Sequence, residues 1–202
     1  MSKITPTKAN LIKSKSMLEF SKKGYKLLDK KRNILVKEMM ARTEEIKKIR
    51  KEIDSKFEDI YLAMIYLNMT MGENAVEEIA LSIPKNEDIK ILSKSIMGVE
   101  IPYVKYDEKE IQPYYGFYRT NPALDIVVKK SKEVQRLLYK LTEYENAILR
   151  IAEEIKKTTK RANALDKIKI PNFEETTKEI EDSLEEKERQ EFFRLKSVKK
   201  KL

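Results

Sequence analysis

Residues 134–165 read VQRLLYKLTEYENAILRIAEEIKKTTKRANAL, and this stretch decides the fold. Apolar and small side chains recur in it at alternating steps of three and four residues. They are Val134, Leu137, Leu141, Tyr144, Ile148, Ile151, Ile155, Thr158, Ala162 and Leu165. That spacing is the a/d pattern of a coiled coil, in which one side of a helix is buried along its length. The stretch therefore predicts a long helix that needs a partner helix.

A matching stripe runs through the N-terminal part of the chain. Its members are Leu11, Ser14, Leu18, Ser21, Tyr25, Leu28, Arg32, Leu35, Met39, Arg42, Ile46, Ile49 and Ile53, followed by Phe57, Ile60, Met64, Leu67 and Met71. Two such stripes in one chain can bury each other when the chain folds back. We therefore expect a mainly α fold, a long antiparallel two-helix coiled coil formed by the N- and C-terminal segments.

Helix signals divide the chain into three segments. The first helix is expected to start at Thr5-Pro6, as N-cap and first helical residue, and to end before Gly72. The second is expected to start at Asn121-Pro122 and to break or kink near Pro171. These signals predict an N-terminal coiled-coil helix over residues 1–71, a central head over residues 72–121 and a C-terminal coiled-coil helix over residues 122–202.

The predicted central head has a different residue pattern from the two helices. Residues 74–81 predict a short helix, and the β-rich runs 88–96 and 99–104 predict a β-hairpin around Met97-Gly98. Pro102 limits the second run to an edge or a short strand. The loop 114–118 holds four aromatic residues around Gly116. Its aromatic side chains either anchor the head on the coiled coil or form a docking surface for a partner.

Composition excludes several kinds of chemistry. Charged residues make up 38% of the chain and aromatic residues 8%, which is typical of long helices with a thin buried seam. The chain has no Cys and no His, so disulfides, thiolate metal sites and histidine catalysis are absent. Glycine-rich phosphate loops are also absent. With neither a signal peptide nor a membrane-spanning stretch in the sequence, we expect a soluble intracellular protein that is not an enzyme.

The formal net charge of +9 is unevenly distributed. Residues 1–50 hold 15 Lys and Arg against 5 Asp and Glu, and residues 187–202 hold 7 against 2. Residues 174–186, in contrast, hold 1 Lys against 7 Asp and Glu. In a hairpin the two termini share one end, so that end is predicted to be basic and to bind an acidic partner. Charge alone leaves nucleic acid, anionic lipid and acidic protein open, and the lack of a nucleic-acid module ranks nucleic acid low.

Three ordered motifs make the chain resemble the central-stalk D subunit of the V-type and A-type rotary ATPases (ATP synthases). The first comprises Pro6-Thr7-Lys8, Leu11, residues 23–32 and Leu35; the second is residues 96–102; the third comprises residues 159–166, Ile170-Pro171 and residues 186–196. The resemblance covers nearly the whole chain. The sequence departs from the family at Lys160-Arg161-Ala162, where a second Arg and a Val are common.

The resemblance implies a non-catalytic rotor shaft without a cofactor. Such a shaft transmits torque between ATP hydrolysis or synthesis in the catalytic ring and ion transport, including hydrogen ion transport, in the membrane ring. Its implied partners are the catalytic A and B subunits, the F subunit of the stalk and a connector subunit of the membrane ring. Its implied place is cytoplasmic and peripheral to the membrane. The alternative is a free-standing basic coiled-coil adapter, which would not co-purify with these subunits.

Two sets of residues are candidates for partner contact. Contact with the catalytic ring is expected from Lys23, Gly24, Lys26, Lys30, Arg32, Arg161, Arg189, Phe193 and Arg194. Contact with membrane-side partners is expected from Met97, Gly98, Tyr115 and Phe117. Gly24 is either a tolerated exposed residue or the site of a close approach, which we favour because Gly is costly inside a helix. No residue is a candidate for catalysis, cofactor binding or metal binding.

Overall fold

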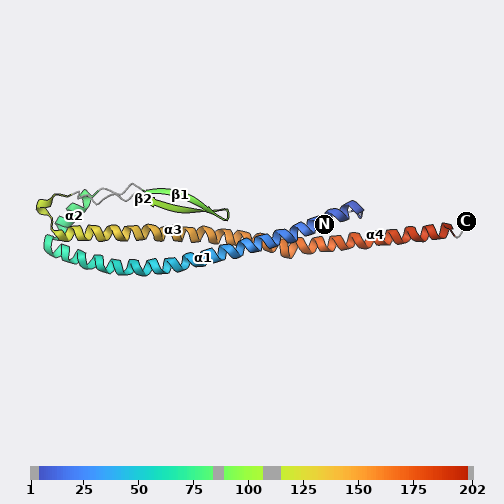
Figure 1. Cartoon of the computed structure of the whole chain (residues 1–202), viewed down its shortest axis with the longest axis horizontal. Helices are drawn as coiled ribbons and strands as arrows, with labels where there is room; N and C mark the ends of the chain where they lie inside the picture. Colours follow the sequence, from blue (N-terminus) through green and yellow to red (C-terminus); the bar gives the residue numbers. More distant parts are fainter. Residues whose placement is uncertain (1–4, 84–88, 107–114, 200–202) are drawn as a thin grey trace. The chain divides into compact units, whose positions relative to one another are not determined.

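The computed structural model describes residues 5–83, 89–106 and 115–199, and these are mainly helical (Figure 1). The elements in chain order are α1 (Lys8–Met71), α2 (Glu73–Ser82), β1 (Ile89–Ile96), β2 (Val99–Tyr106), η1 (Phe117–Arg119), α3 (Pro122–Ala164), η2 (Leu165–Lys169) and α4 (Ile170–Lys199). The predicted fold class is confirmed: a long N-terminal helix, a long C-terminal helical segment and a small antiparallel hairpin.

The chain divides into two compact units, and the boundaries fall within α1 and α3. Met1–Ile34 and Ile155–Leu202 form the unit that we call the terminal unit. Leu35–Glu154 form the central unit. The division into three segments at residues 71 and 121 remains a prediction.

In the terminal unit the first part of α1 and α4 run antiparallel. Three ion pairs join them: Lys8 Nζ to Glu188 Oε1 at 2.9 Å, Lys15 Nζ to Glu181 Oε1 at 2.5 Å and Lys22 Nζ to Glu174 Oε1 at 2.6 Å. Each step between pairs is seven residues on both helices, which is the repeat of a coiled coil. The described part of this unit buries only two apolar side chains, those of Ala162 and Ile180; its other buried residues are Ser14, Ser21, Thr158 and Thr177.

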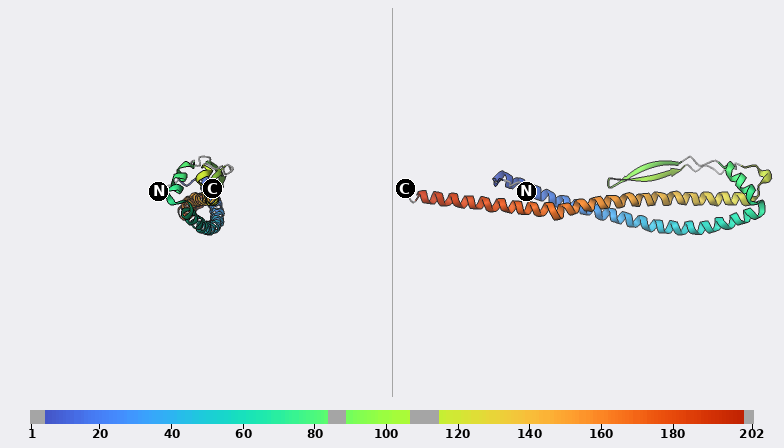
Figure 2. Two further views of the ribbon diagram at one scale, coloured as in Figure 1. Left: turned by 90° about the vertical axis from the view of Figure 1, so that its left-hand side faces the viewer. Right: turned by 180° about the vertical axis from the view of Figure 1, so that it is seen from behind.

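In the central unit the rest of α1 packs antiparallel to α3, and the front and rear views agree on this (Figures 1 and 2). Ion pairs join Arg50 to Glu145 at 2.7 Å and Lys56 to Glu133 at 2.9 Å. The closed end of this unit holds a cluster of Leu67, Val76, Ala123, Leu124 and Val127. Fourteen buried apolar side chains lie in this unit's described residues, so it carries most of the hydrophobic stabilisation.

The helix ends follow local chemistry, with one shift from the sequence prediction. The first helix begins at Lys8 rather than at Thr5-Pro6, because the Thr7 hydroxyl accepts the N–H of Asn10 at 3.2 Å and so caps the helix. Gly72, with φ +83°, separates α1 from α2 as predicted. Asn121 precedes α3 as its N-cap, since its side-chain Oδ1 accepts the N–H of Ala123 at 3.5 Å and its backbone carbonyl accepts the N–H of Leu124 at 2.8 Å.

The predicted break near Pro171 is a five-residue π-helical turn, η2, rather than an end of the helix. The N–H of Ile170 bonds to the carbonyl of Leu165, five residues earlier. Proline lacks an N–H, and its ring collides with the carbonyl four residues before it in a regular α-helix. A wider turn just before Pro171 moves that carbonyl, on Lys167, and lets helical backbone continue into α4.

Candidate partner-binding surfaces

All nine candidates for contact with the catalytic ring lie in the terminal unit. Three of them have a local acidic partner on their own helix. Lys23 pairs with Glu19 at 2.7 Å, Arg32 with Asp29 at 2.5 Å and Arg189 with Glu186 at 3.6 Å. The hydrogen bond from Lys23, followed by its positive charge, lowers the pKa of the Glu19 carboxyl. Part of the predicted basic surface is therefore already neutralised by the chain.

The acidic stretch 174–186 has a defined role in the terminal unit. Together with Glu188 it supplies the carboxylates that meet Lys8, Lys15 and Lys22. The hydrogen bond that Lys8 donates to Glu188, followed by the charge of Glu188, raises the pKa of the Lys8 ammonium group. These interhelical pairs could not be found from local spacing, because they depend on the register between two distant helices.

The remaining cationic candidates are open to a partner. Within the described residues, no ion pair involves Lys26, Lys30, Arg161 or Arg194, and all four side chains are exposed. Arg194 lies past Glu188, where α4 has only exposed residues. These four residues are the strongest cationic candidates for intermolecular contact.

Exposed apolar side chains accompany this basic surface. On α4, Phe192 and Phe193 contact each other edge to face at 6.3 Å, and Phe193 is 57% exposed. On α1 a second stripe of Phe20, Leu27 and Ile34, at steps of seven residues, was not predicted from the sequence. The stripe is offset from the buried seam, and Phe20 is 73% exposed. Heptad spacing outside the seam is the signal that could have identified it.

Gly24 lies opposite the π-helical turn. A Cβ atom at this position would lie 3.6 Å from Leu165 Cδ1, an ordinary van der Waals distance. Within the chain a methyl group would fit beside Leu165, and the close approach of a partner at Gly24 stays a prediction.

The four candidates for membrane-side contact lie in the central unit, at two separate places. Met97 and Gly98 form the tight turn between β1 and β2, with φ angles of +51° and +78°. Positive φ at both positions is the geometry of a two-residue hairpin turn, which glycine adopts readily. Tyr115 and Phe117 lie instead beside the start of α3.

The hairpin is fixed on α3 through β2. Val104 donates its backbone N–H to Glu143 Oε2 at 3.4 Å, and Arg150 donates to the carbonyl of Glu100 at 3.2 Å. The rings of Tyr106 and Tyr139 lie 6.0 Å apart. The turn is therefore near Arg150, whereas Tyr115 bonds to Asp125. A separation of 25 residues along α3 is roughly 38 Å at 1.5 Å per residue.

Tyr115 is an anchor of the loop, which is one of the two roles expected for these aromatics. It packs against the cluster around Leu124 and donates its hydroxyl hydrogen to Asp125 Oδ1. Burial, reinforced by the hydrogen bond and the charge of Asp125, raises the pKa of Tyr115 to about 12. Phe117 is 73% exposed and remains available to a partner.

The described residues offer little for pocket chemistry. An open hollow of about 300 Å³ in the central unit is lined by Asp59, Leu62, Ala63, Tyr66, Ala123, Ile126 and Lys130. Lys130 Nζ is engaged there with the carbonyl of Asp59 at 3.3 Å. In the part of the chain that the structure describes, no group of three or more acidic side chains could hold a metal ion. No helix over those residues is long and apolar enough to cross a membrane.

Paired helices and exposed basic and apolar surfaces define a coiled-coil protein that works through contact with other chains. Residues 10–200 match the family model of the ATP synthase D subunit, and the chain belongs to that family. It is 40% identical over 199 residues to the V-type ATP synthase D subunit of Thermotoga neapolitana, covering 98% of both chains.

Archaeal relatives show the same extent of similarity. The chain is 35% identical over 200 residues to the A-type ATP synthase D subunit of Pyrococcus furiosus, covering 98% of this chain and 94% of the relative. It is 37% identical over 199 residues to that of Methanobrevibacter smithii, covering 97% and 86%. The resemblance found from the sequence motifs is confirmed.

Proposed function

We propose that this protein is the central rotor shaft of a V-type or A-type ATPase. In this role it transmits torque between the ATP chemistry of a catalytic ring and ion transport in a membrane ring. The shaft itself is non-catalytic and lies on the cytoplasmic side, peripheral to the membrane. Its partners are the A and B subunits around the terminal unit, and the stalk's F subunit and a connector subunit on the membrane side.

One observation carries this proposal. The described part of the terminal unit buries two apolar side chains and exposes ten large ones, including Phe20, Leu27 and Phe193. A helix pair with so little buried apolar surface gains little stability on its own, and exposed apolar side chains mark interaction sites. Enclosure by other chains would bury these side chains and explain why they are retained.

The helical backbone suits the transmission of torque. The described α1 is a single helix of 64 residues with no interruption, and the π-helical turn keeps the backbone helical between α3 and α4. Force applied to one end of such a helix is carried by its hydrogen bonds and by the ion pairs to its neighbour.

The mechanism is one of differential binding. Two unequal helices present different side chains in different directions, so they cannot fit all equivalent interfaces of a surrounding ring in the same way. Each angular position then favours a different set of open and closed interfaces, and ATP hydrolysis moves the shaft to the next. A difference in binding free energy between states is the condition for any ligand-driven switch.

The test is to replace Lys26 and Lys30 together by Gln. A matched control replaces Lys47 and Lys48 by Gln, which removes the same charge from exposed residues of the central unit; among the described residues these two lysines pair only with neighbouring glutamates. We expect the first variant to retain fewer A and B subunits, or to pump fewer ions per ATP hydrolysed, and the control to match the wild type.

Two outcomes would count against the proposal. If both variants retain A and B subunits equally well and pump equally many ions per ATP hydrolysed, the basic surface does not have the proposed role. Purification of the wild-type chain without A and B subunits would instead favour the free-standing adapter.

A further inference from the structure

The two edges of the β-hairpin differ in their free backbone groups. In the ladder, Ile96 pairs with Val99 and Ser93 with Pro102. Since a two-residue turn joins the strands, the pair next to it exchanges hydrogen bonds, and bonded pairs then alternate along the ladder. The backbone groups of Glu100, Pro102 and Val104 therefore point away from β1, toward the outer edge of β2.

The outer edge of β2 is closed at three successive outward positions. The carbonyl of Glu100 accepts a hydrogen bond from Arg150, and the N–H of Val104 donates to Glu143. Between them lies Pro102, which has no N–H to offer. Both proline and coverage by side chains are ways in which proteins block a strand edge.

The outer edge of β1 has no such protection. By the same alternation, Ile91, Ser93 and Ser95 direct their N–H and C=O groups outward, and all three residues are exposed. Among the residues that the structure describes, none forms a hydrogen bond with these groups. A bare row of backbone groups is a template for a further strand.

We propose that the outer edge of β1 binds an extended, acidic segment of a partner polypeptide as a third strand. The proposal rests on the proposed function, because it assigns a binding mode to the central unit of a shaft that works among other chains. Main-chain hydrogen bonds supply the affinity in this mode of recognition, and alternate side chains supply the specificity.

The side chains of β1 define the chemistry of the segment. Lys90, Leu92 and Lys94 share one face of the strand, and all three are exposed. A strand paired with β1 places its own side chains opposite these three. The face therefore selects acidic, apolar and acidic residues at alternate positions. On the other face Ile91, which is 73% exposed, selects an apolar neighbour.

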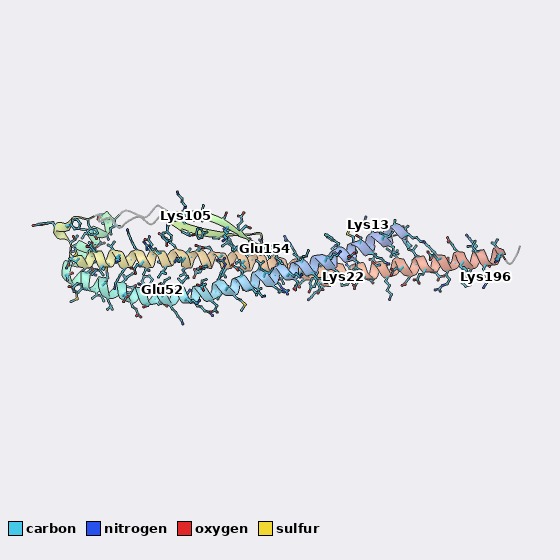
Figure 3. All side chains as sticks on the ribbon, in the orientation of Figure 1. Lys13, Lys22, Glu52, Lys105, Glu154 and Lys196 are labelled. Atoms are coloured by element: carbon cyan, nitrogen blue, oxygen red, sulfur yellow. The ribbon has the colours of Figure 1, made fainter. Side chains whose placement is uncertain are left out.

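The same charges disfavour a second copy of this chain. Two β1 strands paired edge to edge would bring Lys90 and Lys94 of both copies close together, with Lys105 on β2 adding to the positive charge (Figure 3). Lysines on an edge strand are a common device against self-pairing. An acidic strand would instead place negative charges beside these lysines, so that each repulsive contact becomes attractive.

The experiment compares the full chain alone with the purified ATPase complex by residue-resolved hydrogen exchange. We expect the amides of Ser93 and Ser95 to exchange at least about tenfold more slowly in the complex, a factor that corresponds to one protected hydrogen bond. Leu92 and Lys94 are internal references, because their amides already bond to β2 in the isolated chain.

A pair of substitutions tests the edge directly. Ser93→Pro removes an outward N–H and leaves the ladder to β2 intact, because Ser93 is at a position that does not bond to Pro102. Ser93→Ala keeps the N–H and is the matched control. A photo-crosslinking residue at Ile91 of the complex should capture an acidic, extended segment, and Ser93→Pro should abolish the capture while Ser93→Ala retains it.

Each outcome decides whether the outer edge of β1 binds a third strand. Exchange at Ser93 and Ser95 as fast in the complex as in the isolated chain overturns the proposal, as does capture of a second copy, a helix or a basic segment. If the complex assembles normally with A and B subunits in that case, only the strand-binding proposal fails. If no such complex forms, the proposed function fails first. An unchanged melting temperature of Ser93→Pro shows that the variant is folded.

Discussion

Replacing Gly24 by Ala should make the isolated protein more stable. Gly24 lies inside α1, where Ala is favoured over Gly by about 1 kcal/mol. The new methyl group would meet Leu165 Cδ1 at 3.6 Å, a distance that needs no movement. For a chain of this size, 1 kcal/mol corresponds to a rise in melting temperature of about 2–4 °C.

Gly98→Ala is the matched control with the opposite sign. A methyl group at Gly98 would have no described atom within 4 Å, but the φ of this residue is +78°. A left-handed backbone costs an L-residue with a Cβ atom roughly 1–2 kcal/mol. The same chemical change should therefore lower the melting temperature, and the contrast isolates backbone conformation from packing.

Circular dichroism during thermal unfolding is the assay for both variants. A lower melting temperature for Gly24→Ala would refute the reasoning about α1 and the fit of the methyl group. The same variant also tests contact with the ring. If it is stabilised alone but assembles poorly, glycine is retained for the approach of a partner. If Gly24→Ala assembles fully and couples ATP hydrolysis to ion pumping normally, Gly24 is not one of the residues that contact the ring.

Three further predictions concern stability. Ile151→Ala should cost about 2–5 kcal/mol in urea unfolding, because Ile151 is fully buried, whereas Leu149→Ala, at a 64% exposed site, should be near neutral. Tyr115→Phe should lose roughly 1 kcal/mol at neutral pH. The fold raises the pKa of Tyr115 to about 12, so the stability that this group contributes to the wild type is lost as the pH rises from about 10 to 12. The variant should not show that loss when melting temperatures are measured over a series of pH values. Lys15→Glu should destabilise by less than about 1 kcal/mol, with recovery on adding Glu181→Lys and little effect in high salt, because the pair is partly exposed.

The seam and the turns were predictable because they depend on local spacing. Every described position of the C-terminal stripe is buried or half-buried, from Val134 to Leu165. In the N-terminal stripe one position shifts, since Ala63 packs on the core cluster while Met64 is 37% exposed. The hairpin turn at Met97-Gly98 also follows from its neighbours alone.

The surfaces were less predictable because they depend on contacts between distant segments. Nothing in the local sequence indicates that Glu143 and Arg150 close the edge of β2. The two halves of the membrane-side set were grouped because they belong to one segment, yet β2 is fixed on α3 far from Tyr115. Proline chemistry indicated an irregularity near Pro171 but not that a π-helical turn would absorb it.

The equal spacing of the three lysine–glutamate pairs in the terminal unit has a consequence for alignment. If α4 slid by one heptad, Lys15 would meet Glu188 and Lys22 would meet Glu181, so only one pair of three would be lost. A series of equally spaced lysine–glutamate pairs cannot by itself define the register between the two helices. Unique alignment must come from features that occur once, such as Leu165 opposite Gly24 and the lone buried isoleucine of α4, Ile180. These few features, which do not repeat along the helices, fix the register between the two helices.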